Sequence, residues 1–128
     1  MVLRGATAGD KQAMLGIMQP HRNAYFPGKL DTRRVRIAMI GLDVVGFVGW
    51  DTDQVQALYV AEAWRSKRLV GPALLTAAEC AIRDAGHQQV RIMINADDDR
   101  AHRFYQKHDY ETAWDPRQNE IAWMTKRL

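Results

Sequence analysis

The sequence predicts a single domain of the α/β (α+β) class, residues 1–128, in which helices cover both faces of a mixed, mostly antiparallel sheet. Three observations support this prediction. Strand-type and helix-type segments follow one another in the order β-α-loop-β-β-β-α-β-α-β-β, with short turns between them. The length of 128 residues suits one domain. The hydrophobic content of 47% can fill a small core, and no linker or internal repeat divides the chain.

The N-terminal third is expected to hold one short strand, one helix and a loop. Met1–Arg4 has a strand-like pattern. A helix is expected to begin at Thr7 or Asp10, because both residue types cap helix N-termini well. One face of this helix would carry Ala13, Met14, Ile17 and Met18, and Pro20 would end or bend it. The segment His21–Asp31 contains a Pro-Gly pair and is expected to form a loop.

The middle of the chain predicts three strands joined by tight turns, which are Val35–Ile40, Val44–Trp50 and Gln54–Val60. A helix should follow from Pro72 to about Ala85, because proline is favoured at the first helical position and Gly86 would end the helix. Its apolar stripe would consist of Leu74, Leu75, Ala78, Ile82 and Ala85. Cys80 is expected to be buried in this helix as a small apolar residue, not to act as a nucleophile.

The C-terminal third predicts a buried strand, a short helix and a hairpin. Val90–Ile94 is the strand, and Tyr110–Trp114 and Ile121–Lys126 form the hairpin around an Asp-Pro turn. Between strand and hairpin, the acidic run Asp97–Asp99 is interpreted as an N-terminal helix cap. A metal site is disfavoured, because three consecutive carboxylates point in different directions and no His or Cys stands at ligand spacing.

One tyrosine is singled out by its place on this short helix. Asn95 ends a strand, the acidic cap follows, and Ala101 precedes Tyr105 by one helical turn. The layout resembles the last conserved motif of the GNAT superfamily of N-acyltransferases. Asp98 stands where that family often has Asn, and Asp109 replaces the usual Gly of the next turn, where Asp tolerates a left-handed conformation. The resemblance implies that Tyr105 faces the sulfur of an acyl-coenzyme A.

A second segment is similar to the coenzyme A segment of the same family. There a Leu-x-Val strand leads to a basic residue, a glycine-rich loop and a helix that begins with small residues and a Leu-Leu pair. In this chain Leu58 and Val60 lie on the strand, Arg65 is the basic residue and Gly71 is the last glycine. The loop has one extra residue and lacks the earlier glycines, which would let successive amides turn toward an anion. The charges of Arg65, Lys67 and Arg68 are expected to substitute for them.

The resemblance implies a specific set of residues around acetyl-coenzyme A. The pantetheine arm would pair with a free strand edge where two central strands splay apart, and a backbone amide there would polarise the thioester carbonyl, worth ~3–4 kcal/mol in other enzymes. The implied cofactor-binding residues are Leu58, Tyr59, Val60, Arg65, Ser66, Lys67, Arg68, Val70, Gly71, Pro72, Asn95, Ala101 and Tyr105. An ordinary central strand, a solvated basic loop and a strand-ending turn are the structural alternatives.

The implied reaction is direct attack of a primary amine on the thioester. Tyr105 is then the catalytic residue, because an acid near the sulfur helps the thiolate to leave. The reference pKa of tyrosine is about 10 against about 8.5 for a thiol, so complete proton transfer is uphill by ~2 kcal/mol. We therefore expect a hydrogen bond that stabilises the thiolate, with transfer completed late. The neighbouring Phe104 is expected to turn to the core.

The sequence leaves the general base open. Many GNAT enzymes use a Glu on the strand before the loop, whereas this strand carries Gln54 and Gln56, which cannot take a proton at neutral pH. Asp51 and Asp53, at the turn entering the strand, are candidates, although the favoured interpretation is that they bond their own turn. His21 has a suitable pKa and lies in the loop that usually lines the acceptor pocket. Water is the remaining alternative.

The leading hypothesis is an acetyl-coenzyme A-dependent N-acetyltransferase that acts on a small-molecule or protein amine. The alternative is a catalytically weak or inactive acyl-coenzyme A-binding regulatory module of the same fold, because the loop glycines and the strand carboxylate are missing. A nucleic-acid-binding domain is disfavoured, since the net charge is only +3 and the 18 basic residues are scattered among 15 acidic ones.

The remaining features concern compartment and assembly. A single cysteine excludes an internal disulfide, and the sequence shows neither a membrane-spanning run nor a signal peptide, so a cytoplasmic setting is expected. Trp114 and Trp123 of the C-terminal hairpin are available either to pair with a second copy or to cover the sheet. A homodimer is therefore one expectation.

Overall fold

The computed structural model describes residues 1–18, 31–67, 69–114 and 121–128. In this part of the chain seven strands form one sheet: β1 (Val2–Gly5), β2 (Val35–Ile40), β3 (Asp43–Asp51), β4 (Gln54–Val60), β5 (Gln89–Asn95), β6 (Glu111–Trp114) and β7 (Ile121–Arg127). The helices are α1 (Lys11–Met18), α2 (Val70–Asp84) and α3 (Asp99–Lys107), with 3₁₀ turns η1 (Ala8–Asp10), η4 (Thr32–Arg34) and η5 (Glu62–Lys67). The predicted fold class and element order are confirmed.

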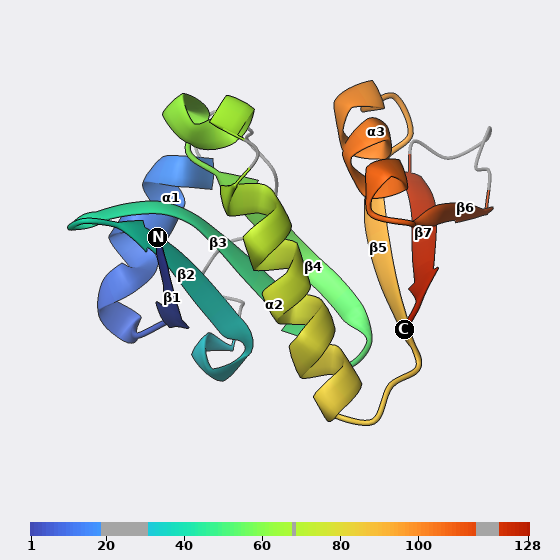
Figure 1. Cartoon of the computed structure of the whole chain (residues 1–128), viewed down its shortest axis with the longest axis horizontal. Coiled ribbons are helices and arrows are strands. Elements are labelled where there is room, and N and C mark those ends of the chain that lie inside the picture. Colours follow the sequence, from blue (N-terminus) through green and yellow to red (C-terminus); the bar gives the residue numbers. More distant parts are fainter. Residues whose placement is uncertain (19–30, 68, 115–120) are drawn as a thin grey trace.

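The strands lie in the order β1-β2-β3-β4-β5-β7-β6, and all neighbours are antiparallel except β4 and β5. In Figure 1, α2 crosses one face of the sheet and α1 lies on the other. Alternate side chains of β3 serve the two faces: Val45 and Val48 pack with Leu74 of α2, whereas Phe47 packs with Met14 of α1. This alternation follows from the two-residue period of a strand, and it gives the sheet a core on each face.

The N-terminal end of α2 lies very close to β3, and a glycine makes this approach possible. A Cβ at Gly46 would lie 2.9 Å from the Tyr59 carbonyl oxygen and 2.9 Å from Cδ1 of Leu74. Both the backbone of β4 and a side chain of α2 therefore occupy the space that any larger residue would need. Gly46 fixes where α2 begins relative to β4.

Strands β4 and β5 pair only at their first residues. The parallel register joins Gln54 to Arg91 and Val55 to Ile92, and it ends there. Beyond these residues β4 stays paired with β3 as far as Val60, and β5 stays paired with β7 as far as Asn95. The two central strands thus diverge, as the resemblance implied, and the gap between them opens toward their C-terminal ends (Figure 1).

Three expectations about α2 need correction. The helix begins at Val70, so Pro72 is its third residue and not its first. Cys80 is exposed, not buried, because it lies off the stripe that faces the sheet, and Ala85 is exposed beyond the last turn. The buried stripe contains Val70, Leu74, Leu75, Ala78, Glu79 and Ile82, so a carboxylate enters the core where the pattern predicted only apolar residues.

The ends of α2 and α3 otherwise follow the predicted signals. Gly86 has φ of +97°, and the His87 N–H donates to the Ile82 carbonyl at 3.3 Å, which is the hydrogen bond of a Schellman cap. Asp109 after α3 has φ of +71°, as its residue type allows. Among the described residues, no helix is both long enough and apolar enough to cross a membrane.

Candidate active site

A cavity of about 830 Å³ occupies the gap where β4 and β5 part. Four elements supply its walls: β4 with Gln54–Val60, β5 with Ile92–Asn95, the beginning of α2, and one face of α3. The cavity is open to solvent, and its strand walls run from the last β4–β5 pairs to the C-terminal ends of both strands. An elongated ligand therefore fits between the strands without displacing any backbone pairing.

Tyr105 lies at the inner wall of this cavity, where α3 meets the sheet. The Asp98 carboxylate accepts a hydrogen bond from the Ala101 N–H at 3.0 Å, which confirms the predicted cap of α3. Tyr105 is only 6% exposed, and its ring packs edge-on against Phe104 and Tyr110 with centroids 5.0 and 5.5 Å apart. The helix cap and the two rings together hold the phenol in one place.

The Tyr105 phenol is a strong candidate for a hydrogen-bond donor. Burial, followed by the nearby charges of Tyr59 and Asp98, raises the pKa of Tyr105 well above its ordinary value. Its hydroxyl has no hydrogen-bond partner among the described residues, and the side chain lines the cavity. A neutral phenol facing an open cavity can donate its proton to a negative ligand atom.

Phe104 packs against the core, as predicted, but it also borders the cavity. It is half-buried, lines the cavity, and packs across the mouth of the gap against Gly71 of α2, where an added Cβ would lie 3.3 Å from the ring. The ring of His108 packs against the ring of Phe104 at a tilt of 54°, with centroids 4.8 Å apart. Tyr105 is more deeply buried than Phe104, and both side chains border the cavity.

The cavity-facing edge of β4 offers unpaired backbone groups. The Ala61 N–H donates to the Val45 carbonyl of β3 at 2.8 Å, so Tyr59, two residues earlier, also turns its backbone toward β3. Leu58 and Val60 turn theirs to the opposite edge, where β5 has already diverged. The Val60 carbonyl accepts a hydrogen bond from Arg65 Nε at 3.0 Å. The Leu58 amide and carbonyl and the Val60 amide therefore face the cavity.

The pairing of β3 with β4 shifts register just before these unpaired backbone groups. The pairing of β3 with β4 shifts between Gly49 and Trp50, so that Gln56 is an extra residue on β4. Such a bulge bends a strand and increases its local twist. It coincides with the point at which β4 leaves β5, and Gln54 and Gln56 both line the cavity beside it.

The beginning of α2 closes the outer end of the cavity. Arg65, Gly71 and Pro72 line it, and Val70 is buried beneath it. The first intrahelical bond runs from the Ala73 N–H to the Leu69 carbonyl, so Val70 and Gly71 carry the N–H groups that a helix N-terminus leaves for an anion. Pro72 has no N–H, so it adds no donor to this set.

Some of the predicted loop residues lie outside the described part. Arg68 is one of them, and so are the side chains of Ser66 and Lys67, although both backbones belong to η5. That 3₁₀ turn was not expected from the sequence, which predicted only a loop there. Asn95 and Ala101 line the cavity, at the end of β5 and in the first turn of α3.

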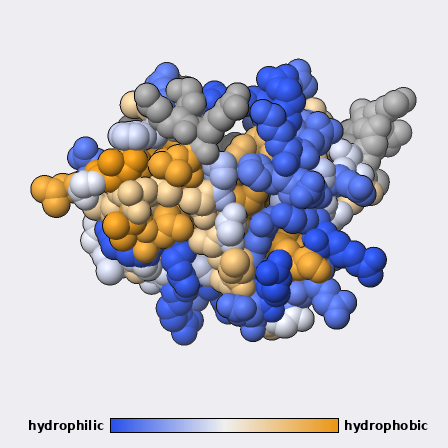
Figure 2. All heavy atoms as spheres, viewed as in Figure 1, coloured by the Kyte–Doolittle hydropathy of each residue, from blue (hydrophilic) through white to orange (hydrophobic). Residues whose placement is uncertain are grey.

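Three polar residues of α3 also line the cavity and were missed by the sequence reasoning. Arg100, Lys107 and His108 share the helix face of Phe104, at spacings of three and four residues that would have predicted this. Arg65, Arg100 and Lys107 thus place three permanent positive charges on the cavity wall, whose described part carries one carboxylate, that of Asp98. The wall is therefore suited to a polyanion. Figure 2 shows hydrophilic residues gathered over the half of this face that contains α3, and apolar ones over β2 and β3.

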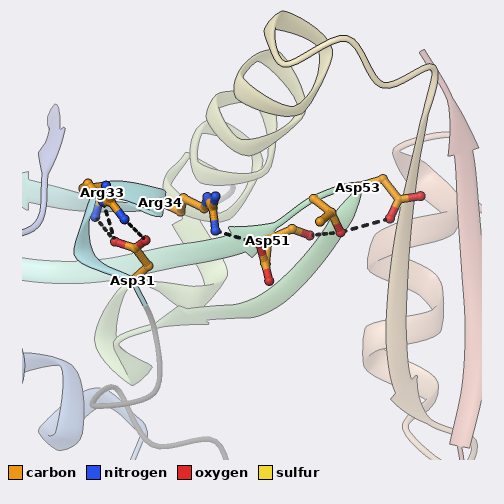
Figure 3. A network of polar contacts seen from close by, with 6 residues as sticks. Asp31, Arg33, Arg34, Asp51 and Asp53 are labelled. Carbon is orange, nitrogen blue, oxygen red and sulfur yellow. Dashed lines mark hydrogen bonds and ion pairs between the residues drawn. The ribbon is translucent and has the colours of Figure 1, made fainter.

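Neither candidate carboxylate base lies at the cavity. Asp51 forms an ion pair with Arg34 at 2.7 Å, and both Asp51 and Asp53 lie at the β3–β4 turn (Figure 3). Asp53 forms an ion pair with Arg91 of β5 at 3.0 Å. Burial alone would raise the pKa of Asp53, but the hydrogen bond and charge of Arg91 outweigh it and lower this pKa below its ordinary value. His21 lies outside the described residues, as do Tyr25 and Phe26. The only base candidate that the described cavity wall adds is His108.

Two other expectations concern metals and the hairpin. Within the described ranges, no three His, Cys, Asp or Glu side chains come together as a metal site requires. Trp123 of β7 carries the guanidinium of Arg91 over its ring at 5.2 Å, so this tryptophan helps to cover the sheet. The side chain of Trp114 lies outside the described part.

Comparison with known proteins agrees with this geometry. Residues 31–112 match a family model described as an acetyltransferase (GNAT) domain. Among solved structures, Ard1 from Thermoplasma volcanium aligns with a TM-score of 0.83 at 19% identity, covering 99% of this chain and 97% of that one. A ribosomal-protein-alanine N-acetyltransferase from Brucella melitensis aligns with a TM-score of 0.76 at 16% identity, covering 100% of both chains.

A third structure was solved with a ligand. PaiA N-acetyltransferase from Thermoplasma acidophilum, in complex with coenzyme A, aligns with a TM-score of 0.77 at 14% identity, covering 99% of this chain and 98% of that one. At such identities these likenesses establish the fold. No curated protein sequence matches the chain.

Proposed function

We propose that this chain, which belongs to the GNAT acetyltransferase family, transfers the acetyl group of acetyl-coenzyme A to a primary amine. Family membership gives the acyltransferase activity and the acetyl donor. The amine acceptor and the roles of individual residues are the further content of the proposal. The observation that carries it is the cavity between diverging strands β4 and β5, with the Tyr105 phenol on its inner wall.

The residues of the cavity fit an acyl-coenzyme A. The unpaired edge at Leu58 and Val60 can bond the amides of a pantetheine arm as an added strand would. Arg65, Arg100 and Lys107 supply positive charge, and the N–H groups of Val70 and Gly71 supply two donors for phosphate oxygens. Part of the positive charge that takes the place of the missing loop glycines thus lies on α3 and not in the loop itself.

We assign groups of this chain to two of the chemical steps. The amine nitrogen attacks the thioester carbonyl carbon, and the amide of Leu58 or Val60 donates to the oxygen that becomes negative. The carbon–sulfur bond then breaks, and Tyr105 donates a hydrogen bond to the departing sulfur. Because burial raises the pKa of Tyr105, the phenol stays neutral and acts by donation.

The attacking amine must be neutral, and its proton leaves through water or His108. No carboxylate of the described cavity wall is available for this step, because Asp98 is engaged in capping α3. The rate should therefore rise with pH as more of the amine is deprotonated. An acceptor of low pKa is expected to react faster than a fully protonated alkylamine.

A regulatory module that binds acyl-coenzyme A without turnover is the second candidate. Two observations favour it, namely the absence of a carboxylate base on the described wall and the donor that Pro72 removes from α2. A thiol-release assay with acetyl-coenzyme A over a panel of amines separates the two. Acceptor-dependent release that falls in Tyr105→Phe supports the enzyme. Binding by calorimetry without release for any amine supports the module.

A further inference from the structure

We propose that Asp53 and Arg91 are a positioning pair that sets how far β4 and β5 diverge, and thereby controls the affinity of the cleft for acyl-coenzyme A. The inference rests on the proposed function of that cleft. The sequence made Asp53 a candidate general base. We assign it instead a role in the geometry of the site, in which it transfers no proton.

The pair lies where the two strands begin to part. The Arg91 N–H donates to the Asp53 carbonyl at 2.8 Å, so the backbones are joined one residue before the first registered pair. The Asp53 carboxylate also accepts a hydrogen bond from Arg91 Nε at 3.0 Å, and Nη2 of Arg91 lies 3.0 Å from it. One residue of each strand is thus held by backbone and side chain together.

The domain is built as two parts that meet here. Strands β1 to β4 are continuously paired and carry α1 and α2, while β5, β7 and β6 are continuously paired and carry α3. Backbone pairing between the parts is limited to two registered positions and the Asp53 carbonyl. The cleft lies between the same two parts. On one face α2 also joins them, through a shared apolar core and through Glu79 with Tyr110 and Lys126. The junction at Asp53 and Arg91 holds the parts at the sheet itself, so the angle there contributes to the width of the cleft.

A small change of angle at the junction has a large effect at the cleft. Leu58 and Val60 lie three and five residues beyond Val55, which is about 10–16 Å along a strand. A rotation of about 5° at the junction would displace these residues by about 1 Å relative to β5. Displacements of this size are enough to spoil both strand-like bonding to a ligand and catalytic alignment.

The surroundings of the pair make it rigid. The Asp53 side chain is only 19% exposed. The guanidinium of Arg91 lies over the ring of Trp123, so β7 holds it from the other side. A planar guanidinium bonded in its plane and stacked on its face has little freedom to move.

The same turn provides a matched control. Asp51, two residues before Asp53, pairs with Arg34 at 2.7 Å, but this ion pair joins β3 to η4 and does not cross to β5 (Figure 3). Replacement of either aspartate by asparagine removes one ion pair beside the β3–β4 turn. Only the removal of Asp53 acts on the junction between the two parts.

The test compares Asp53→Asn, Asp53→Glu and Asp51→Asn in the full chain. Calorimetry with acetyl-coenzyme A should show Kd raised about tenfold in Asp53→Asn, partly restored in Asp53→Glu, and within twofold of wild type in Asp51→Asn. Thermal unfolding is measured alongside, and all titrations are made well below the lowest Tm. Equal Kd values for Asp53→Asn and Asp51→Asn would overturn the proposal.

Amide hydrogen exchange without ligand gives an independent result. Exchange at β4 and β5 should accelerate in Asp53→Asn relative to Asp51→Asn, and unchanged exchange there would also overturn the proposal. The two proposals fail differently. A wild-type chain that binds no acetyl-coenzyme A refutes the function assigned to the cleft, whereas a binding wild type with unaffected Asp53 variants refutes the positioning role alone.

Discussion

The ring of Tyr110 packs edge-on against the ring of Tyr105, with centroids 5.5 Å apart and planes at 68°. The Tyr110 hydroxyl in turn donates to the buried Glu79 carboxylate of α2 at 2.8 Å. Lys126 of β7 completes this group, with Nζ 3.1 Å from Glu79. The phenol at the cavity is thus supported from behind by a polar contact between α2 and the C-terminal strands.

Tyr105→Phe should lower kcat by about 10²-fold and leave the KM for acetyl-coenzyme A nearly unchanged. The ring and its packing remain, and only the donor to the departing sulfur is lost. Steady-state kinetics with one amine at several acetyl-coenzyme A concentrations measures both constants. A variant with wild-type kcat would show that the sulfur needs no donor from this residue.

The pH profile checks the protonation state of the same residue. Because burial raises the pKa of Tyr105, the phenol stays protonated throughout the range in which amine acceptors lose their proton. The wild-type rate should therefore rise with pH to a plateau with no fall below about pH 10. A descending limb that disappears in Tyr105→Phe would contradict this assignment.

Tyr110→Phe should lower stability without a comparable loss of activity. The substitution leaves the Glu79 carboxylate without one of its two partners, at a cost of about 1–3 kcal/mol in the free energy of unfolding. The ring that supports Tyr105 is retained, so kcat should stay within a few-fold of wild type. Urea unfolding and the thiol-release assay, run on the same preparation, measure the two effects.

Gly46→Ala should destabilise the protein by about 1–3 kcal/mol, because its Cβ would lie 2.9 Å from both the Tyr59 carbonyl oxygen of β4 and Cδ1 of Leu74, and would force α2 away from the sheet. Gly16→Ala in α1 is the matched control, since nothing lies within 4 Å of its added Cβ. Alanine has the higher helix propensity, so that variant should gain up to about 1 kcal/mol. Urea unfolding gives both values, and a neutral Gly46→Ala would mean that α2 is not seated as described.

Asp10→Asn should remove a pH-dependent part of the stability. The Asp10 carboxylate accepts from Arg4 at 2.7 and 2.8 Å and from the Thr7 N–H at 2.8 Å. The Arg4 hydrogen bond outweighs burial and, with the Thr7 amide, lowers the pKa of Asp10 to about 2. A lowered carboxyl pKa stabilises the fold above the unfolded pKa of 3.8, and this stabilisation disappears as pH falls toward 2.

The expected difference between wild type and Asp10→Asn is about 1–2 kcal/mol near pH 7, since Arg4 is partly exposed to solvent. It should shrink between about pH 4 and pH 2. The exposed Asp43 provides the comparison, because Asp43→Asn removes a carboxylate that makes no described ion pair. Urea unfolding of both proteins across this pH range measures the difference in the free energy of unfolding. A difference that is independent of pH would contradict the assignment of the lowered pKa to Asp10.

Local signals predicted much of the fold and the inner half of the site. Gly86, Asp98 and Asp109 each act at a helix end through their own backbone preference, which a single sequence displays. Tyr105 was found because its neighbours in sequence form the whole motif. The diverging strands followed from the family resemblance, since nothing within β4 or β5 alone states where their pairing ends.

The remaining features depend on contacts between segments far apart in sequence. Glu79 is buried because Tyr110, just before β6, and Lys126 of β7 reach it, which no helical pattern reveals. From the sequence, Asp53 was interpreted as a turn residue, because its partner Arg91 lies 38 residues later in the chain. The start of α2 two residues before Pro72 likewise depends on Gly46, which lets Val70 pack against β3.

The most direct test of the central claim is a crystal structure of the protein with coenzyme A bound. The account predicts the pantetheine arm between β4 and β5, bonded to the backbone of Leu58 and Val60, with the sulfur within hydrogen-bond distance of the Tyr105 hydroxyl. It also predicts the phosphates near Arg65 and the beginning of α2. Coenzyme A bound elsewhere, or in the cleft with its sulfur remote from Tyr105, would contradict it.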